Sequence, residues 1–350
     1  MRVLVTGADG YIGAMLTPLL LERGHRVVGL DAGYYRDGWL YDDGRPRPQM
    51  VTKDLRDIDA ADVVEFDAVV HLAELSNDPL AQHDPRLTYQ INHRGSVELA
   101  RTCKTAGVER FVYTSSCSVY GAAADGGFRT EASPPNPQTA YADCKTLVER
   151  DVGALADERF CPVFLRNATA YGPSPRMRFD IVLNDLSGHA WTSGVVKVMS
   201  DGTPWRPLVH VQDIALAIAL ALEAPRDRVH SEIFNVGDDA QNYSVREIAE
   251  IVAACFPGAR TSFGQPSGDN RSYRVAFGKI RQHLPEFRCR YTAADGAQHL
   301  HDVFSRIGMS AETFAFRAYT RLKQLQHLVA THEIDGDFRR REDAPLAVTA

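Results

Sequence analysis

The sequence predicts an α/β fold in which helices cover both faces of a parallel sheet. Short apolar segments rich in β-branched residues alternate with segments of helical length through the first half of the chain. Strands joined through helices run parallel, because each helix returns the chain to the end of the sheet where the last strand began. The expected strands are residues 2–6, 26–30, 68–72, 110–114 and 162–166.

The segment between the first two expected strands has the pattern of a helix. Within residues 11–23, Ile12, Leu16 and Leu20 recur at helical spacing. Gly24 follows, and glycine commonly ends a helix. The first 30 residues therefore form a strand–helix–strand unit.

After Gly172 the alternation weakens. A turn at residues 200–205, a helix at 213–222 and a strand at 232–236 predict a smaller second lobe. From residue 333 the chain is rich in Asp, Arg and Ala without periodicity. The expected organisation is a first domain over 1–172, a second lobe over 173–332 with some strands and helices returning to the first domain, and a loose tail over 333–350.

The composition is typical of a globular protein and excludes several kinds of partner. A formal charge of −6 offers no general attraction for polyphosphate, so no nucleic-acid partner is expected. No run approaches the roughly 18 apolar residues that cross a membrane, and the segment MRVLVTGADGYIG lacks the features of a signal peptide. The six cysteines lack metal-ligand spacing, so neither a metal nor a disulfide is expected. We therefore expect a cytoplasmic protein without a membrane partner.

A glycine-rich turn indicates a phosphate-binding site. Gly7, Gly10 and Gly13 lie between the first strand and the first helix, where backbone amides can approach a diphosphate at the helix N-terminus. Their spacing differs by one residue from the usual dinucleotide fingerprint, and a simple tight turn is the alternative. Asp31 ends the second strand about 20 residues after the middle glycine, where a carboxylate can bind the ribose hydroxyls. The pair of features predicts a Rossmann-type, doubly wound domain.

The carboxylate of Asp31 favours NAD, because it repels the extra phosphate of NADP. Arg36 lies close enough in sequence to keep NADP open. Asp54 and Leu55 follow a short third strand and would flank the adenine, unless they form an ordinary surface turn. The expected cofactor contacts are Gly7, Gly10, Tyr11, Ile12, Gly13, Asp31, Asp54, Leu55, Leu72, Ala73, Tyr141 and Lys145.

A tyrosine and a lysine are the candidate catalytic pair. Tyr141 and Lys145 are four residues apart in a helical stretch and share one helix face. A nearby ammonium favours the phenolate and lowers the pKa of a tyrosine, which makes a base usable at neutral pH. Ser116 follows the fourth expected strand, where its hydroxyl can hold a substrate oxygen against the tyrosine.

Taken together, TGADGYIG, Asp31, YTSSCSVYG, YADCK and RPLVHVQDIA resemble the extended short-chain dehydrogenase/reductase family. The likeness covers residues 1–284 and is strongest to NAD-dependent nucleotide-sugar epimerases and dehydratases of the UDP-galactose 4-epimerase kind. It implies that Tyr141 takes a proton from a sugar hydroxyl while NAD+ receives the hydride, and that Lys145 also holds the nicotinamide ribose. It further implies a nucleotide-diphosphate sugar bound in the second lobe, and a homodimer.

The resemblance also assigns residues to the substrate. Arg206 matches an arginine that binds the substrate diphosphate, and Arg271 is a weaker match for a second one; each could instead be a surface cation. Asn167 and Thr169 stand where the family commonly has tyrosine and asparagine. Glu74 and Ser76 also differ from the family pattern in the sugar pocket. The expected substrate contacts are Ser116, Asn167, Thr169, Arg206 and Arg271.

The resemblance favours epimerisation through a transient keto-sugar. Sugar 4,6-dehydratases of the family carry an Asp-Glu pair after the catalytic hydroxyl, whereas Cys117 and Ser118 stand there in this chain. Cys117 could match the proton-carrying cysteine of 3,5-epimerases or be a buried structural thiol. A 4-ketoreductase that consumes NAD(P)H, a dehydratase and a non-catalytic dinucleotide sensor are the alternatives.

Overall fold

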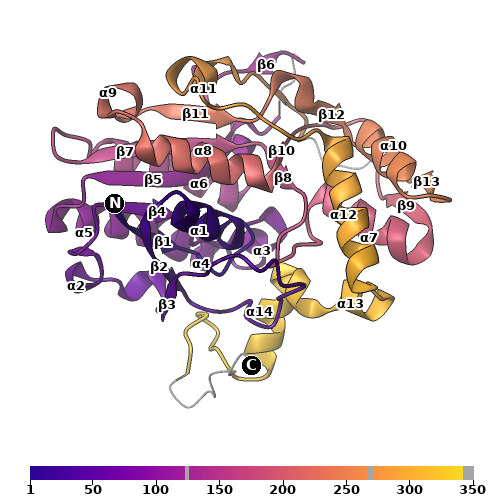
Figure 1. Cartoon of the computed structure of the whole chain (residues 1–350), viewed down its shortest axis with the longest axis horizontal. Helices are drawn as coiled ribbons and strands as arrows, with labels where there is room; N and C mark the ends of the chain where they lie inside the picture. Colours follow the sequence, from indigo (N-terminus) through magenta and orange to yellow (C-terminus); the bar gives the residue numbers. More distant parts are fainter. Residues whose placement is uncertain (123–125, 266–270, 342–350) are drawn as a thin grey trace.

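The computed structural model describes residues 1–122, 126–265 and 271–341. Its described residues form a seven-stranded parallel sheet in the order β11-β7-β5-β4-β1-β2-β3, with helices on both faces (Figure 1). The α/β, Rossmann-type fold is therefore confirmed. The strands are β1 (Arg2–Thr6), β2 (Arg26–Asp31), β3 (Gln49–Thr52), β4 (Ala68–His71), β5 (Arg110–Ser116), β7 (Cys161–Asn167) and β11 (Ile233–Val236).

Each predicted strand is present, and its ends differ from the prediction by at most two residues. The first helix, α1 (Gly13–Glu22), begins later than predicted, because Tyr11 and Ile12 belong to the glycine turn. It ends before Gly24, whose φ of 84° is the left-handed conformation that glycine adopts readily.

Two apolar cores lie on opposite faces of the sheet. On one face, α1 and α8 (Val211–Glu223) pack on side chains such as Val3 and Val5. On the other face, α5 (Ser96–Ala106) and α6 (Ala140–Gly153) pack on the alternate residues of the same strand, such as Leu4. Because β4 is buried along its whole length, it reads as a continuous apolar run in the sequence.

The second half of the chain contributes to both parts of the molecule. The elements α8 and β11 join the sheet layer, whereas a third apolar core joins the helices of the lobe. Figure 1 shows these lobe helices beside the carboxyl ends of the central strands. The lobe contains α7 (Val182–Ser193), α10 (Val245–Cys255), α12 (Ala293–Ile307), the sheet β8 (Thr169–Tyr171), β10 (Trp205–His210), β12 (Asn242–Ser244), and the pair β9 (Val195–Val198), β13 (Arg260–Phe263).

Shorter elements connect these layers. They are η1 (Leu55–Asp57), α2 (Ala60–Val63), α3 (Asp78–His83), α4 (Pro85–Thr88), η2 (Tyr89–Gly95), η3 (Cys117–Tyr120), β6 (Phe128–Arg129), α9 (Arg226–Val229), η4 (Asp239–Gln241), β14 (Arg274–Val275), α11 (Gly278–His283), α13 (Ala311–Ala315), η5 (Arg317–Tyr319) and α14 (Arg321–Ala330). No helix among the described residues has both the length and the apolar character needed to cross a membrane.

The end of the chain returns to the sheet layer and corrects one prediction. After α14, Ile334 and Arg340 form a β-bridge, and Phe338 is buried. The guanidinium of Arg340 donates to the carbonyl oxygen atoms of Ala32 and Gly33, just after β2. The prediction of a loose tail is therefore wrong for residues 333–341, because side chains remote in sequence anchor that segment. The rest of the predicted tail, 342–350, lies outside the described residues.

Candidate active site

A cavity of about 490 Å³ lies where the central strands end and the lobe begins. In an open parallel sheet, ligands bind beyond the carboxyl ends of the strands. Every residue that the sequence analysis assigned to cofactor, substrate or catalysis lines this one cavity. They are Gly7, Gly10, Tyr11, Ile12, Gly13, Asp31, Asp54, Leu55, Leu72, Ala73, Ser116, Tyr141, Lys145, Asn167, Thr169, Arg206 and Arg271.

The glycine turn forms a cradle that only glycine fits. Gly7 has a φ of 72°, and a Cβ there would lie 2.8 Å from the backbone nitrogen of Ala73 at the end of β4. A Cβ on Gly13 would lie 2.4 Å from the carbonyl oxygen of Gly7. The N-cap residue of α1 is Ile12, whose hydrocarbon side chain cannot accept from the N–H groups of the first turn. Backbone N–H groups at that helix end are suited to an anion, so the turn fits a dinucleotide diphosphate.

The carboxylate of Asp31 closes the same end of the cavity. It accepts hydrogen bonds from the backbone N–H groups of Gly33 at 2.7 Å and Asp9 at 3.1 Å. Burial, and then the nearby Asp9, raise the pKa of Asp31 to about 6, so this carboxyl is mostly ionised at neutral pH. The neighbouring Asp54, which also lines the cavity, forms an ion pair with Arg56 at 2.6 Å.

The candidate catalytic residues come together from two elements. Tyr141 and Lys145 lie one turn apart on α6, with the Lys145 ammonium 5.4 Å from the centre of the Tyr141 ring. Ser116 ends β5 and lines the same cavity, and its hydroxyl acts to lower the pKa of Tyr141. The start of α6 is fixed by Thr139, which accepts from the Ala142 N–H at 3.2 Å.

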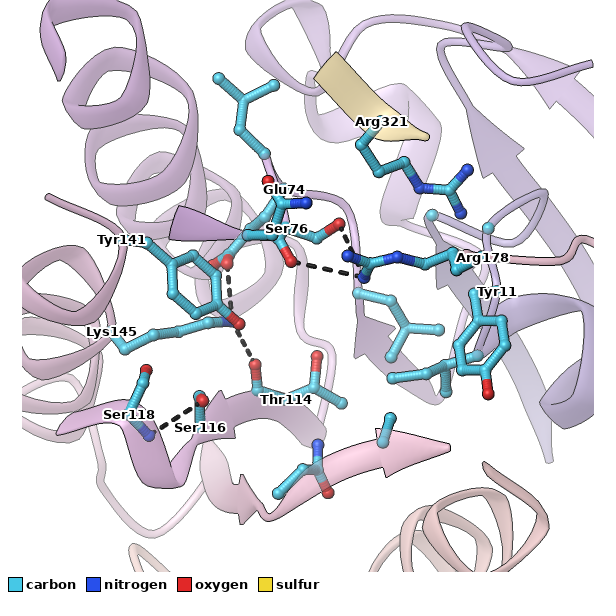
Figure 2. A pocket seen from close by; sticks show the side chains of 18 of the residues that line it. Tyr11, Glu74, Ser76, Thr114, Ser116, Ser118, Tyr141, Lys145, Arg178 and Arg321 are labelled. Carbon is cyan, nitrogen blue, oxygen red and sulfur yellow. Dashed lines mark hydrogen bonds and ion pairs between the residues drawn. The ribbon is translucent and has the colours of Figure 1, made fainter. Parts of the chain in front are cut away.

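The carboxylate of Glu74, a residue with no role predicted from the sequence, lies beside the catalytic lysine (Figure 2). One oxygen lies 2.6 Å from the Lys145 ammonium, and the other accepts from the Tyr113 hydroxyl at 2.5 Å. The side chains of Glu74 and Lys145 are 3% and 5% exposed, so the pair is a buried one. Lys145 also donates to the Thr114 carbonyl oxygen.

This carboxylate changes the electrostatics that the sequence predicted for Tyr141. Burial raises the pKa of Tyr141, Lys145 lowers it, and Glu74 and Asp78 raise it again. Lys145 lowers the pKa as expected, but the net result is a pKa above the ordinary value, because burial outweighs the lysine. Burial, and to a smaller extent the Glu74 carboxylate, oppose the phenolate form of Tyr141 that Lys145 favours.

Arg206 and Arg271 lie together on the lobe side of the cavity. Arg206 donates to the backbone carbonyl oxygen of Arg271, and Arg271 forms an ion pair with Asp78 at the start of α3. Both therefore belong to the cavity wall and are not remote surface cations. Asn167 lies at the end of β7, and its side-chain oxygen is buried without a hydrogen-bond partner among the described residues.

Cys117 lies outside the cavity. The residue is 1% exposed, and its thiol donates to the Arg166 carbonyl oxygen at 3.2 Å. Burial raises its pKa well above the ordinary thiol value. These properties match the buried structural thiol of the two alternatives.

Two cavity arginines were not singled out from the sequence. Arg178 lies in the SPRMRFD segment before α7, and Arg321 begins α14. No sequence motif marks Arg321, because the residues that surround it come from distant parts of the chain. Arg178 follows the Tyr-Gly-Pro segment closely, and that position was its only signal.

Comparison with known proteins identifies the family. Residues 3–237 match the model of the NAD dependent epimerase/dehydratase family. The UDP-glucose 4-epimerase of Mycolicibacterium smegmatis is 31% identical over 267 residues, which cover 72% of this chain and 82% of that protein. MoeE5, solved in complex with UDP-glucuronic acid and NAD, is 29% identical with a TM-score of 0.75, covering 87% of this chain and 99% of MoeE5.

A dehydratase is also among the similar structures. DesIV, a dTDP-glucose 4,6-dehydratase from Streptomyces venezuelae solved with NAD, is 26% identical with a TM-score of 0.77, covering 89% of this chain and 100% of DesIV. The chain belongs to the NAD-dependent epimerase/dehydratase family and to the extended short-chain dehydrogenases/reductases. It is an enzyme whose cofactor is NAD.

Proposed function

We propose that this enzyme is a nucleotide-sugar epimerase that oxidises a sugar carbon to a transient ketone and reduces it again from the other face. The observation that carries the proposal is the meeting of Tyr141, Lys145 and Ser116 in one cavity with a glycine turn and a pair of arginines. The named relatives, which include a UDP-glucose 4-epimerase, support the same reaction class.

Each side chain of the site has a distinct role in this reaction. The Tyr141 oxygen takes the proton of the reacting sugar hydroxyl as the C–H bond breaks, and gives it back when the ketone is reduced. Ser116 holds that hydroxyl against Tyr141, and Lys145 stabilises the phenolate. Bound NAD+ supplies the hydride acceptor, and its reduced form the donor. Arg206 and Arg271 hold the substrate diphosphate, whose two negative charges match their guanidinium groups.

The cofactor would lie between the glycine turn and Asp31. Gly7, Gly10 and Gly13 allow the backbone to approach its diphosphate, and Asp31 accepts from its ribose hydroxyls. Arg36, the residue that kept NADP open, donates to the Thr52 hydroxyl and is engaged there. These contacts therefore favour NAD over NADP as the cofactor.

Elimination is the second candidate reaction, favoured by the likeness to DesIV. It needs an acid and a base beside the sugar ring. Cys117 is buried outside the cavity, and Glu74 is engaged by Lys145. These contacts favour epimerisation over elimination.

The reaction is tested by incubating the enzyme with UDP-glucose, UDP-glucuronic acid and dTDP-glucose in the presence of substoichiometric NAD+. Chromatography should reveal an epimer of at least one sugar nucleotide with unchanged mass and no net NADH. A product lighter by one water would identify a dehydratase. Stoichiometric consumption of NADH with a keto-sugar would identify a ketoreductase.

We propose that the enzyme forms a homodimer and acts in the cytoplasm. The resemblance to dimeric relatives supports the assembly, and the unpaired cysteines agree with a reducing compartment. Light scattering of the purified protein should give twice the 38.7 kDa chain mass. A monomeric mass would contradict the dimer.

A further inference from the structure

Arg178 and Arg321 are buried cations that protein groups only partly satisfy. Their residues are 8% and 2% exposed, yet both line the cavity. The Nη2 atom of Arg178 and the Nη1 atom of Arg321 have no hydrogen-bond partner among the described residues. A buried charged donor without a partner raises the free energy of the folded state. The arrangement therefore indicates a ligand that accepts from both guanidinium groups.

The charge around the two arginines is incompletely balanced. Asp180 pairs with the Arg178 guanidinium at 2.7 Å, but it meets Arg321 only through the Arg321 backbone N–H at 3.0 Å. The Arg321 guanidinium instead stacks on the Tyr35 ring at 3.9 Å. Burial, and then Arg178, lower the pKa of Arg321 to about 10, which still leaves it charged at neutral pH. The missing partner is therefore an anion.

The surroundings place this anion beside the glycine turn. Arg178 donates to the Ser76 carbonyl oxygen and hydroxyl at 3.4 Å, in the loop that follows β4. The Asn184 side-chain amide donates to the Arg178 carbonyl oxygen and to the hydroxyl of Tyr11, a residue of the glycine turn. Figure 2 shows the Arg178 side chain reaching from the Tyr11 side of the view towards Ser76, with Ser116 further away.

We propose that Arg178 and Arg321 bind the diphosphate bridge of the dinucleotide, from the side that the glycine turn leaves open. The proposal rests on NAD as the cofactor of this enzyme. Arginine forms strong charge-assisted hydrogen bonds with phosphate oxygens, and a diphosphate has enough oxygens for both groups. Arg206 donates to the Arg271 backbone and Arg271 pairs with Asp78, so these two other cations serve a second diphosphate, that of the nucleotide sugar.

The C-terminal helix α14 thereby becomes part of the cofactor site. Arg321 is its first residue, and Gln324 in the next turn donates to the Tyr34 carbonyl oxygen at 3.0 Å, just after β2. Arg340 secures the same loop from the end of the chain. A ligand on Arg321 stabilises the docked position of α14, because binding to one arrangement favours it over others.

The test uses Arg321→Met in the full chain, after removal of any co-purified dinucleotide. Methionine keeps an unbranched apolar chain on the Tyr35 ring and removes the charge. Calorimetric titration should show NAD+ and ADP-ribose bound about 10- to 100-fold more weakly than by the wild type. Adenosine, which lacks phosphate, should change by less than about twofold. UDP should be unaffected.

The matched control is Arg317→Met, because Arg317 lies just before α14 and pairs with Asp37 away from the cavity. It should leave all four affinities unchanged. Weaker UDP binding with unchanged NAD+ binding would assign the arginines to the nucleotide-sugar diphosphate and overturn the proposal. Equal losses for NAD+ and adenosine, or no loss at all, would also overturn it.

A second measurement needs no variant. Inorganic pyrophosphate should raise the thermal unfolding midpoint of the wild type and compete with NAD+ for binding. Competition with UDP alone would contradict the cofactor assignment. All of these experiments measure ligand binding. They therefore test the two arginines even if the enzyme proves not to be an epimerase.

Discussion

Glu74→Gln tests how the buried carboxylate controls the catalytic pair. The change keeps the shape of the side chain and an oxygen that can accept from Tyr113, but it removes the charge that lies 2.6 Å from Lys145. The Lys145 ammonium is then buried without a counter-charge. Removing one partner of a buried ion pair typically costs about 3–5 kcal/mol. Because the hydrogen bonds are retained, we expect the free energy of unfolding to fall by about 3 kcal/mol, the lower end of this range.

The same substitution should change the pH dependence of the reaction. Glu74 raises the pKa of Tyr141, whereas Lys145 lowers it. Loss of the carboxylate therefore lowers the pKa of Tyr141, and the phenolate forms at lower pH. Asp78, which also raises this pKa, and Ser116, which lowers it, stay in place. The rising limb of kcat/KM against pH should move to lower pH, since it reports the base of the free enzyme.

The assay combines pH–rate profiles at saturating NAD+ with thermal unfolding. Glu149→Gln is the matched control: it breaks another buried ion pair of α6, with Arg166 at 2.6 Å, outside the cavity. It should lower stability without moving the limb. A Glu74→Gln limb that stays in place, or moves to higher pH, would refute the electrostatic reasoning.

The remaining predictions concern single residues of the site. Tyr141→Phe should lose about 100- to 10,000-fold in kcat, the usual contribution of a positioned acid or base, with little change in NAD+ affinity by titration; near-normal turnover would refute the assignment. Arg206→Ala should raise KM more than it lowers kcat in steady-state kinetics, because a remote diphosphate contributes mostly uniform binding; unchanged kinetics would remove Arg206 from the substrate site. Calorimetry should show tighter binding of NAD+ than of NADP+ because of Asp31, and the reverse order would contradict its role.

The sheet was predictable because its signals are local. Each central strand is a short apolar run, and burial on both faces, as in β4, makes that run continuous. The ends of the helices and strands were less predictable. Tyr11 and Ile12 have helix-compatible side chains, but the turn that Gly7 and Gly13 require delays the start of α1.

The site was predictable where its members are close in sequence or fixed by a turn. Tyr141 and Lys145 share a helix face, and the glycines act through local backbone geometry. Contacts between distant segments left no such signal. Glu74 meets Lys145 from another strand end, and Arg321 reaches the cavity only because α14 folds back onto the loop after β2. The packing of residues 333–341 was missed for the same reason, since its bonds join segments far apart in the chain.

Isotope incorporation tests the hydride-return mechanism most directly. The enzyme is incubated in heavy water with catalytic NAD+ and the sugar nucleotide that it converts, and both isomers are examined by mass spectrometry and proton NMR. The account predicts interconversion with no carbon-bound deuterium, because the hydrogen leaves and returns as hydride. Deuterium on a sugar carbon of the product would contradict it and indicate proton exchange through an enolised intermediate.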